Sequence, residues 1–344
     1  MQSACWRKKH NRKMSLLSKP LTIWIPTFRR PRQLSRLLNN FDQLGIIDFA
    51  DVLISDNDPE GPLASAIANG DGDLPLHVRY RCNSANLSAG VNFLRAFECC
   101  TTPWLMIVGD DDWFKSGAAD QIQDLIASLR DDIAAVKFDS SLFGSQPVCV
   151  SSGLGDYVEQ LSPRNYPDAF NNLCLISNWL FRTDSYRPYL SSAYLGYSSK
   201  ISHLFPALQA CVRDDAKLMF SHLQPVEHGV SDASWPKAAT WFEMVITLAS
   251  FSGFIDSQNR YALLKLLLHS DWRRNIAKCL RVQHFYGDQI LGLDSWRIHV
   301  HLALISAGYL QALLLSWPLL LLPYRWWPRS LRNKLGDPGS IERW

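Results

Sequence analysis

The sequence lacks several patterns that would assign it to a common class of protein. Its eight cysteines include no C-x-x-C pair, and no cysteine or histidine spacing typical of a zinc site occurs. Neither sign of charge dominates, since 35 basic residues stand against 32 acidic ones, which gives a net charge of +3. We therefore expect reduced thiols, a cytoplasmic location, no zinc centre and no nucleic-acid partner.

The chain also lacks internal repeats, low-complexity tracts and, near its start, the apolar segment of a secretory signal. Residues 1–18 are basic instead, and we expect a disordered extension there. One long apolar run exists, because residues 302–324 carry no charge and could cross a bilayer. Pro318 and Pro323 interrupt that run, and tryptophan and arginine follow it. Segment 302–327 therefore predicts a helix lying on the cytoplasmic membrane surface, with core packing or a subunit contact as the alternative.

Hydrophobic periodicity divides the chain into two parts. Up to residue 225, strand patterns alternate with amphipathic helices, which predicts an α/β fold with a mostly parallel sheet flanked by helices. The expected strands are 21–25 (ended by Pro26), 52–55, 77–80, 104–109 and 134–138, and the expected helices are 31–41, 86–98 and 117–129. Residues 144–170 are rich in Gly, Ser and Pro and predict a loop region. Residues 226–344 show only helical patterns and predict a C-terminal all-helical extension.

Three consecutive aspartates, Asp110, Asp111 and Asp112, follow the expected strand 104–109. Carboxylates this close repel one another unless a cation or hydrogen bonds offset the charge. In parallel α/β sheets, ligands bind at the carboxyl ends of the strands, and oxygen ligands suit Mg²⁺ or Mn²⁺. The triplet alone fits either a metal site or an acidic turn into the next helix.

Four segments, taken in order, resemble the family-2 glycosyltransferases of the GT-A fold. They are the first strand with its Pro26-Thr27 ending, the second strand ending at Asp56, the helix start at Asn86, and the aspartate triplet. Each motif alone is weak, so the order and spacing carry the resemblance, which covers roughly residues 20–220. It implies a Rossmann-like GT-A domain at residues 19–225.

The resemblance also implies roles for individual residues. Asp111 would be the first metal ligand for Mg²⁺ or Mn²⁺, Asp112 the second, and Asp110 a third that also faces the ribose of a nucleotide-sugar donor. The residues expected to bind this donor are Pro26, Thr27, Asp56, Asn86 and Asp110. Trp113 and Phe114 could shape the sugar pocket or be plain core.

The acceptor side departs from the family pattern. Where many inverting members place a Glu-Asp pair whose Asp is the acceptor base, this chain has Ser202-His203. Histidine suits general-base work near neutral pH, so we expect His203 and Asp112 to be the catalytic residues. Other possible bases are Asp184, Asp214 and Asp215. His228 could complete the metal or phosphate shell, or lie in a surface turn.

Together these expectations describe a metal-dependent, inverting glycosyltransferase. It would move a hexose or deoxyhexose onto a glycan or lipid-linked glycan in polysaccharide or lipopolysaccharide synthesis, with a faint likeness to O-antigen-type transferases. A non-catalytic GT-A-like scaffold is the main alternative, because the acidic base is missing.

Two other enzyme classes fit less well. Asp56-Asn57-Asp58 resembles the start of a haloacid-dehalogenase-type phosphatase, but Glu60 stands where that fold needs Thr or Val. No lysine lies between the two acidic motifs, although that fold requires one. A nucleotidyltransferase would need a Gly-rich loop after the first strand, which this chain lacks.

Overall fold

A computed structural model describes residues 19–69, 74, 77–143, 146–197, 201–229 and 256–269. The sheet strands are β1 (Leu21–Thr27), β2 (Ala50–Asp56), β3 (Val78–Cys82), β4 (Trp104–Ile107), β6 (Ile133–Phe138), β7 (Cys149–Ser151), β8 (Trp179–Arg182) and β9 (Lys217–Ser221). Their order is β3-β2-β1-β4-β8-β6-β9-β7. A separate small sheet pairs β5 (Trp113–Phe114) with β10 (Val226–Glu227).

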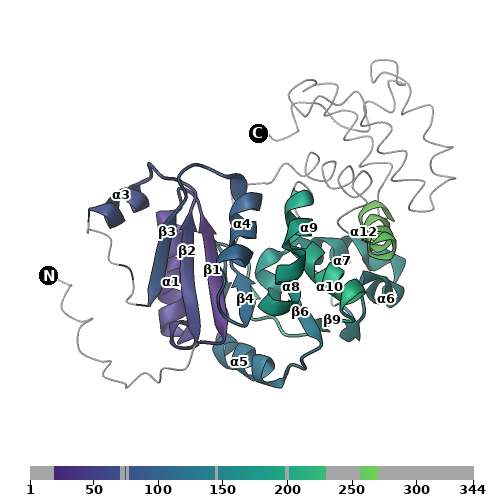
Figure 1. Cartoon of the computed structure of the whole chain (residues 1–344). Coiled ribbons are helices and arrows are strands. Elements are labelled where there is room, and N and C mark those ends of the chain that lie inside the picture. Colours follow the sequence, from purple (N-terminus) through teal and green to yellow (C-terminus); the bar gives the residue numbers. More distant parts are fainter. Residues whose placement is uncertain are drawn as a thin grey trace, which may run out of the picture.

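Helices cover both faces of the large sheet. They are α1 (Pro31–Gln43), α2 (Ile46–Phe49), α3 (Pro62–Ala68), α4 (Ser88–Cys99), α5 (Ala118–Ser128), α6 (Leu154–Glu159), α7 (Tyr166–Cys174), α8 (Thr183–Tyr186), α9 (Leu190–Leu195), α10 (Phe205–Arg213) and α12 (Ser257–His269). Short 3₁₀ turns η2 (Ile176–Asn178) and η5 (Ser202–Leu204) precede β8 and α10. Figure 1 shows β3, β2, β1 and β4 side by side at one end, with α7, α8, α10 and α12 grouped at the other.

The predicted fold class is confirmed. Strands β3, β2, β1 and β4 pair in parallel, as do β6 and β9, whereas β8 runs antiparallel between β4 and β6. Helix α1, expected at residues 31–41, buries Leu34, Leu37, Leu38 and Phe41, which repeat at helical spacing along one face. A mostly parallel sheet flanked by helices is therefore the architecture.

Side chains of each strand alternate between two cores. In β1, Ile23 and Ile25 pack in the core shared with α1 and α5, while Trp24 points to the opposite core with Phe97 of α4 and Trp179 of β8. Strands buried on both faces are expected to be almost continuously apolar, which explains the short hydrophobic runs of the sequence. The acidic residues that follow these runs are consequently held at one edge of a rigid sheet.

Two local predictions were wrong. Strand β1 continues through Pro26 to Thr27, because pairing with β4 stops at Trp24 and the missing proline N–H breaks no ladder bond there. Residues 144–170 are not a loop, since they contain β7, α6 and most of α7. A proline lies in the first turn of α7, where its fixed backbone angle starts a helix rather than ending one.

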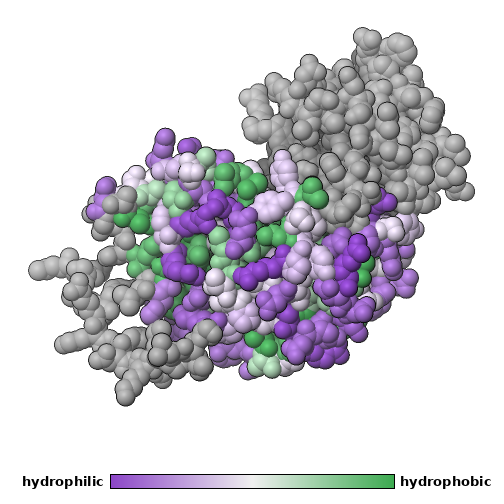
Figure 2. All heavy atoms as spheres, viewed as in Figure 1, coloured by the Kyte–Doolittle hydropathy of each residue, from purple (hydrophilic) through white to green (hydrophobic). Residues whose placement is uncertain are grey.

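The C-terminal region begins with strand β10 rather than a helix, because Val226 and Glu227 pair with β5. Beyond residue 229 it is described only at residues 256–269, where α12 packs against α6 and α7 and buries Leu263, Leu264 and Leu266 in their core. The basic extension 1–18 and the apolar segment 302–327 lie outside the described residues. Within the described ranges, no helix has the length and apolar character needed to cross a membrane. On the face seen in Figure 2, hydrophilic side chains spread over the surface and hydrophobic ones form small groups.

Candidate active site

One edge of the sheet collects the polar residues that follow the strands. Because β1, β2 and β4 are parallel, Thr27, Asp56 and Asp110 come together at their carboxyl ends. Thr27 lies opposite Asp56 in the strand register, and its Oγ1 donates to Asp110 Oδ2 at 2.7 Å. The structure thus brings together residues that are far apart in the sequence.

Asp56 ends β2 and is almost fully buried. Its Oδ1 accepts from the backbone N–H of Asp58 at 3.0 Å, and its Oδ2 accepts from the Tyr80 hydroxyl at 3.0 Å. Burial raises the pKa of Asp56, although both hydrogen bonds act in the opposite direction. Each carboxylate oxygen has a second lone pair, so Asp56 can still accept from a ligand.

An asparagine network supports the neighbouring loop. Asn57 Nδ2 donates to Asn86 Oδ1 at 3.3 Å and to the Ser88 carbonyl at 3.0 Å, while Asn57 Oδ1 accepts from Asn83 Nδ2 at 2.9 Å. Asn86 therefore lies at the site's rim as a partner of Asn57. Buried side-chain amides need such partners, and this network fixes the entry to α4 beside the ends of β2 and β3.

Asp110 is buried, and its carboxylate accepts hydrogen bonds from two side chains. Thr27 donates to one carboxylate oxygen, and Arg30 Nη1 donates to the other at 3.0 Å. Burial raises the pKa of Asp110, while the hydrogen bond from Thr27 and the charge of Arg30 oppose that rise. This side chain is thus held in one orientation at the end of β4.

Asp111 is more exposed and shares the same arginine. Arg30 Nη1 donates to its Oδ2 at 3.1 Å, and Arg36 Nη2 donates to its backbone carbonyl at 2.9 Å. Burial lowers the pKa of Arg30, but the carboxylates of Asp110 and Asp111 outweigh this and raise it. One guanidinium therefore neutralises part of the triplet's charge.

Asp112 contacts two segments far along the chain. Its Oδ2 accepts from Ser177 Oγ at 2.5 Å, and its Oδ1 accepts from the Gly229 N–H at 3.1 Å. His228 Nδ1 lies 3.3 Å from the same Oδ1. The side chain of His228 is 6% exposed beside the triplet, which does not support the surface turn considered for it. Its Nε2 is enclosed without a hydrogen-bond partner among the described residues.

Two glycines leave room for this arrangement. A Cβ on Gly109 would lie 3.0 Å from both Asp111 Oδ1 and Asp112 Oδ2, and one on Gly229 would lie 2.0 Å from the Asp111 carbonyl oxygen. Any side chain at Gly229 would therefore collide with backbone. The glycines allow the triplet and the His228 loop to approach each other closely.

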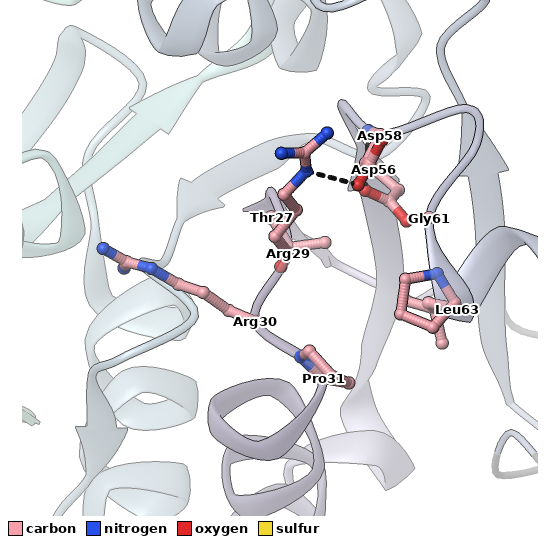
Figure 3. Close-up of a pocket in the computed structure, with 9 residues that line it drawn as sticks. Thr27, Arg29, Arg30, Pro31, Asp56, Asp58, Gly61 and Leu63 are labelled. Carbon is pink, nitrogen blue, oxygen red and sulfur yellow. Dashed lines mark hydrogen bonds and ion pairs between the residues drawn. The ribbon is translucent and has the colours of Figure 1, made fainter.

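A pocket lies beside the ends of β1 and β2 (Figure 3). Its lining residues are Thr27, Arg29, Arg30, Pro31, Asp56, Asp58, Gly61, Pro62 and Leu63. Of the residues expected to bind a donor, Thr27 and Asp56 line it, whereas Pro26 is buried within β1. Arg29, at φ 59°, adopts a left-handed backbone that is rare outside glycine, and its Nε donates to Asp58 Oδ2 at 2.8 Å.

The donor set around Asp111 and Asp112 suits a divalent ion by chemistry. Two carboxylate oxygens converge near Gly109, and a buried imidazole nitrogen without a partner lies in the adjoining loop. Among the described residues, however, no group of three or more His, Cys, Asp or Glu side chains is arranged as a metal cage. The ligand types fit, and Arg30 holds two of the carboxylates in this structure.

His203 does not reach this cluster as an acceptor base would. Its ring is 2% exposed and lies edge-on to Trp179 and Phe181. Burial lowers its pKa to about 3, which the hydrogen bond to the Leu173 backbone opposes only in part. Helix α10 begins at the same edge of the sheet as the aspartate triplet, because it runs back to the start of the parallel strand β9. The side chain of His203, however, points into the core, so its position does not support the predicted base role.

The three alternative bases lie at the opposite edge. Asp184 lies in α8, directly after β8, and the N–H of the preceding Thr183 donates to the Pro103 carbonyl just before β4 begins. Asp214 and Asp215 precede β9, and Asp214 accepts from the Tyr189 hydroxyl at 2.8 Å. Antiparallel β8 and the chain reversal after α10 carry these carboxylates away from the aspartate triplet, so their positions do not support a role as the acceptor base.

Sequence reasoning missed several residues of the site. Arg30 and Ser177 carry no local signal, because only folding shows that they contact the triplet. Asp139 does have a signal, since it follows β6 as Asp110 follows β4, and it accepts from Asn172 and from Gln224. Phe114 is plain core, stacked on Phe41 at 5.1 Å between ring centroids.

Comparison with known proteins agrees with the predicted fold and family. Residues 22–175 match the Glycosyl transferase family 2. The crystal structure of TarS 1-349 from S. aureus is similar, with 11% identity over 88% of this chain and 92% of that chain and a TM-score of 0.50. The same TarS fragment in complex with UDP gives 12% identity, the same coverage and a TM-score of 0.52. No curated protein sequence matches the chain.

Proposed function

Since residues 22–175 form a glycosyl transferase family 2 domain, we propose that this protein transfers a sugar from a nucleotide-diphosphate donor to a hydroxyl acceptor. One observation carries the proposal. Thr27, Asp56 and the aspartate triplet, which lie in three separate segments, meet at one edge of the sheet beside a pocket. Ligands of open α/β sheets bind at this edge.

The pocket residues provide for a nucleoside. Asp56 is held by Asp58 and Tyr80, so its carboxylate is fixed before a base or ribose donates to it. Thr27 lies beside Asp56 in the strand register and donates to Asp110, so it links the two carboxylates. A nucleoside bound between them would place its diphosphate toward the triplet, because Asp110 ends the neighbouring strand.

Asp111 and Asp112, with His228 beside them, would hold a Mg²⁺ or Mn²⁺ ion. Such an ion neutralises the charge that develops on a leaving diphosphate when the sugar bond breaks. Ser177 and the Gly229 N–H keep Asp112 in place for this work. Inversion at the sugar follows from the family resemblance.

The acceptor and location extend the proposal further. A glycan or lipid-linked glycan in cell-surface polysaccharide synthesis suits the composition of segment 302–327, which favours a cytoplasmic membrane surface. Binding to vesicles of anionic lipid by the full chain, but not by a chain ending at residue 301, would support that location. Equal binding by both chains would contradict it.

The central experiment measures nucleotide binding and turnover together. A thermal-shift screen of UDP, GDP, CDP and dTDP with Mn²⁺ should raise the unfolding midpoint with one of them, because a ligand of the folded state stabilises it. The matching nucleotide sugars should then be hydrolysed or transferred. Asp111→Ala should lose this turnover, while Asp124→Ala, an exposed carboxylate on α5, should retain it.

The same experiment separates the enzyme from a non-catalytic scaffold. A scaffold would show no turnover with any donor, and Asp111→Ala would leave nucleotide binding unchanged. That combination would contradict the proposed function.

A further inference from the structure

Arg30 occupies a position between the pocket and the acidic cluster. It lies in the short connection between β1 and α1, and its Nη1 donates to Asp110 Oδ1 at 3.0 Å and to Asp111 Oδ2 at 3.1 Å. Its side chain is 29% exposed, so a ligand in the adjoining pocket can reach it. Figure 3 shows Arg30 diverging from Arg29, which reaches toward Asp58 instead.

The charges explain why an arginine stands here. Asp110, Asp111 and Asp112 place three carboxylates at the end of one strand, and Asp110 is largely removed from water. A cation within about 3 Å of two of them offsets their mutual repulsion. Arg30 therefore does in this structure what a divalent ion would do if it bound to Asp111.

A guanidinium and a divalent ion compete for the same carboxylate. A metal ion bound at Asp111 Oδ1, the oxygen near Gly109, would share that carboxylate with Arg30, which donates to Oδ2, and would repel the guanidinium. The displaced side chain needs another anion. Arginine pairs well with phosphate through two parallel N–H donors, and the pocket that Arg30 lines is the expected place of the donor.

The backbone around Arg30 favours a movement of the side chain alone. Arg29 is held in a left-handed conformation and tied to Asp58, and Pro31 begins α1 directly after Arg30. Both neighbours fix the main chain. The long arginine side chain can still exchange partners by rotation about its own bonds.

We propose that Arg30 is the internal counterion of the acidic cluster and that it transfers to the donor's diphosphate when a divalent cation binds Asp111. The diphosphate part rests on the proposed function, whereas the competition with the cation does not. The substitution Arg30→Gln should consequently have opposite effects on two ligands. The loss of the guanidinium should strengthen binding of the cation, which loses a competitor, and weaken binding of the diphosphate, which loses a partner.

The test compares wild type, Arg30→Gln, Arg30→Lys and Arg32→Gln. Arg32 is an exposed arginine on α1, so its substitution controls for the loss of one positive charge. Mn²⁺ binding without nucleotide is measured by the electron paramagnetic resonance of free Mn²⁺. Binding of UDP, GDP, CDP and dTDP in saturating Mn²⁺ is measured by calorimetry, and thermal melting confirms that each variant folds.

Arg30→Gln should bind Mn²⁺ roughly tenfold more tightly than wild type and the preferred nucleotide roughly tenfold more weakly, as the loss of one close charge pair predicts. Arg30→Lys should lie between the two, and Arg32→Gln should match wild type. Mn²⁺ binding by Arg30→Gln that is no tighter than that of wild type would overturn the inference. Failure of the proposed function would appear differently, as wild-type protein that binds none of the four nucleotides.

Discussion

Two halves of the sheet differ in where they keep their ionisable groups. In the parallel half, formed by β3, β2, β1 and β4, Asp56 and Asp110 to Asp112 follow the strands and gather at one edge. In the mixed half, formed by β8, β6, β9 and β7, Lys137 and His203 lie inside the core. The edge groups lie at the ends of strands beside a pocket, where a ligand can approach them, whereas the core groups are enclosed by other side chains of the fold.

Lys137 illustrates the mixed half. Its Nζ donates to the Phe138 carbonyl at 2.6 Å and to Asn172 Oδ1 at 2.8 Å, and it lies over the Trp179 ring. Burial lowers the pKa of Lys137 well below its usual value. Such a group is satisfied by neighbours within the protein, so the difference between the halves predicts that edge substitutions change chemistry and core substitutions change stability.

The largest effect should come from Asp112→Asn. The amide keeps the size of the side chain but removes a charge and one acceptor facing Ser177 or Gly229. Loss of charge beside a reacting diphosphate should lower the transfer rate roughly 100-fold or more. Steady-state kinetics measures this, with thermal melting to show that folding persists and Asp124→Asn as the control. Transfer within a few-fold of wild type would show that Asp112 is structural.

A smaller effect is expected at the nucleoside end of the edge. Asp56→Asn removes a charged acceptor and should weaken nucleotide binding roughly tenfold, as the loss of one charge-assisted hydrogen bond predicts. Tyr80→Phe is the matched variant, because it keeps the carboxylate and removes only its hydroxyl partner, so binding should weaken less. Calorimetry with the preferred nucleotide measures both. Equal losses in the two variants would mean that Asp56 acts by holding Tyr80.

The smallest effect on transfer, and the clearest effect on stability, should come from His203→Phe. The pKa of His203 is about 3 in the folded protein and near 6.5 in the unfolded chain. Between these values the imidazole is protonated in the unfolded chain and neutral in the folded protein. This contribution to stability is complete above the unfolded pKa and falls with pH by up to about 1.4 kcal/mol per unit toward the folded pKa. The variant should lack this part of the decline.

Urea denaturation of wild type and His203→Phe between pH 7.5 and 5 checks the slope. Because the residue is in the core, transfer should stay within a few-fold of wild type at neutral pH. A loss of more than roughly 100-fold with unchanged stability would restore His203 as the acceptor base.

How much the sequence could predict also differs between the halves. Strands β1, β2 and β4 are mostly apolar runs followed by polar residues, so the sequence places Asp56 and Asp110 to Asp112 at the carboxyl ends of strands. The mixed half gives weaker signals. Strand β7 has three residues, and α7 begins with a proline-containing turn, so a loop was predicted where the structure has a strand and helices.

The sequence by itself determined the alternation of strands and helices and the acidic residues at the strand ends, because both are local patterns along the chain. Only the tertiary structure decided which groups these acids meet. Arg30 bonds to Asp110 across 80 positions and Ser177 to Asp112 across 65, and neither partner differs locally from an ordinary loop residue. The inward turn of His203 was likewise decided by packing against Trp179 and Phe181, since sequence position fixes the end of a helix but not the direction of a side chain.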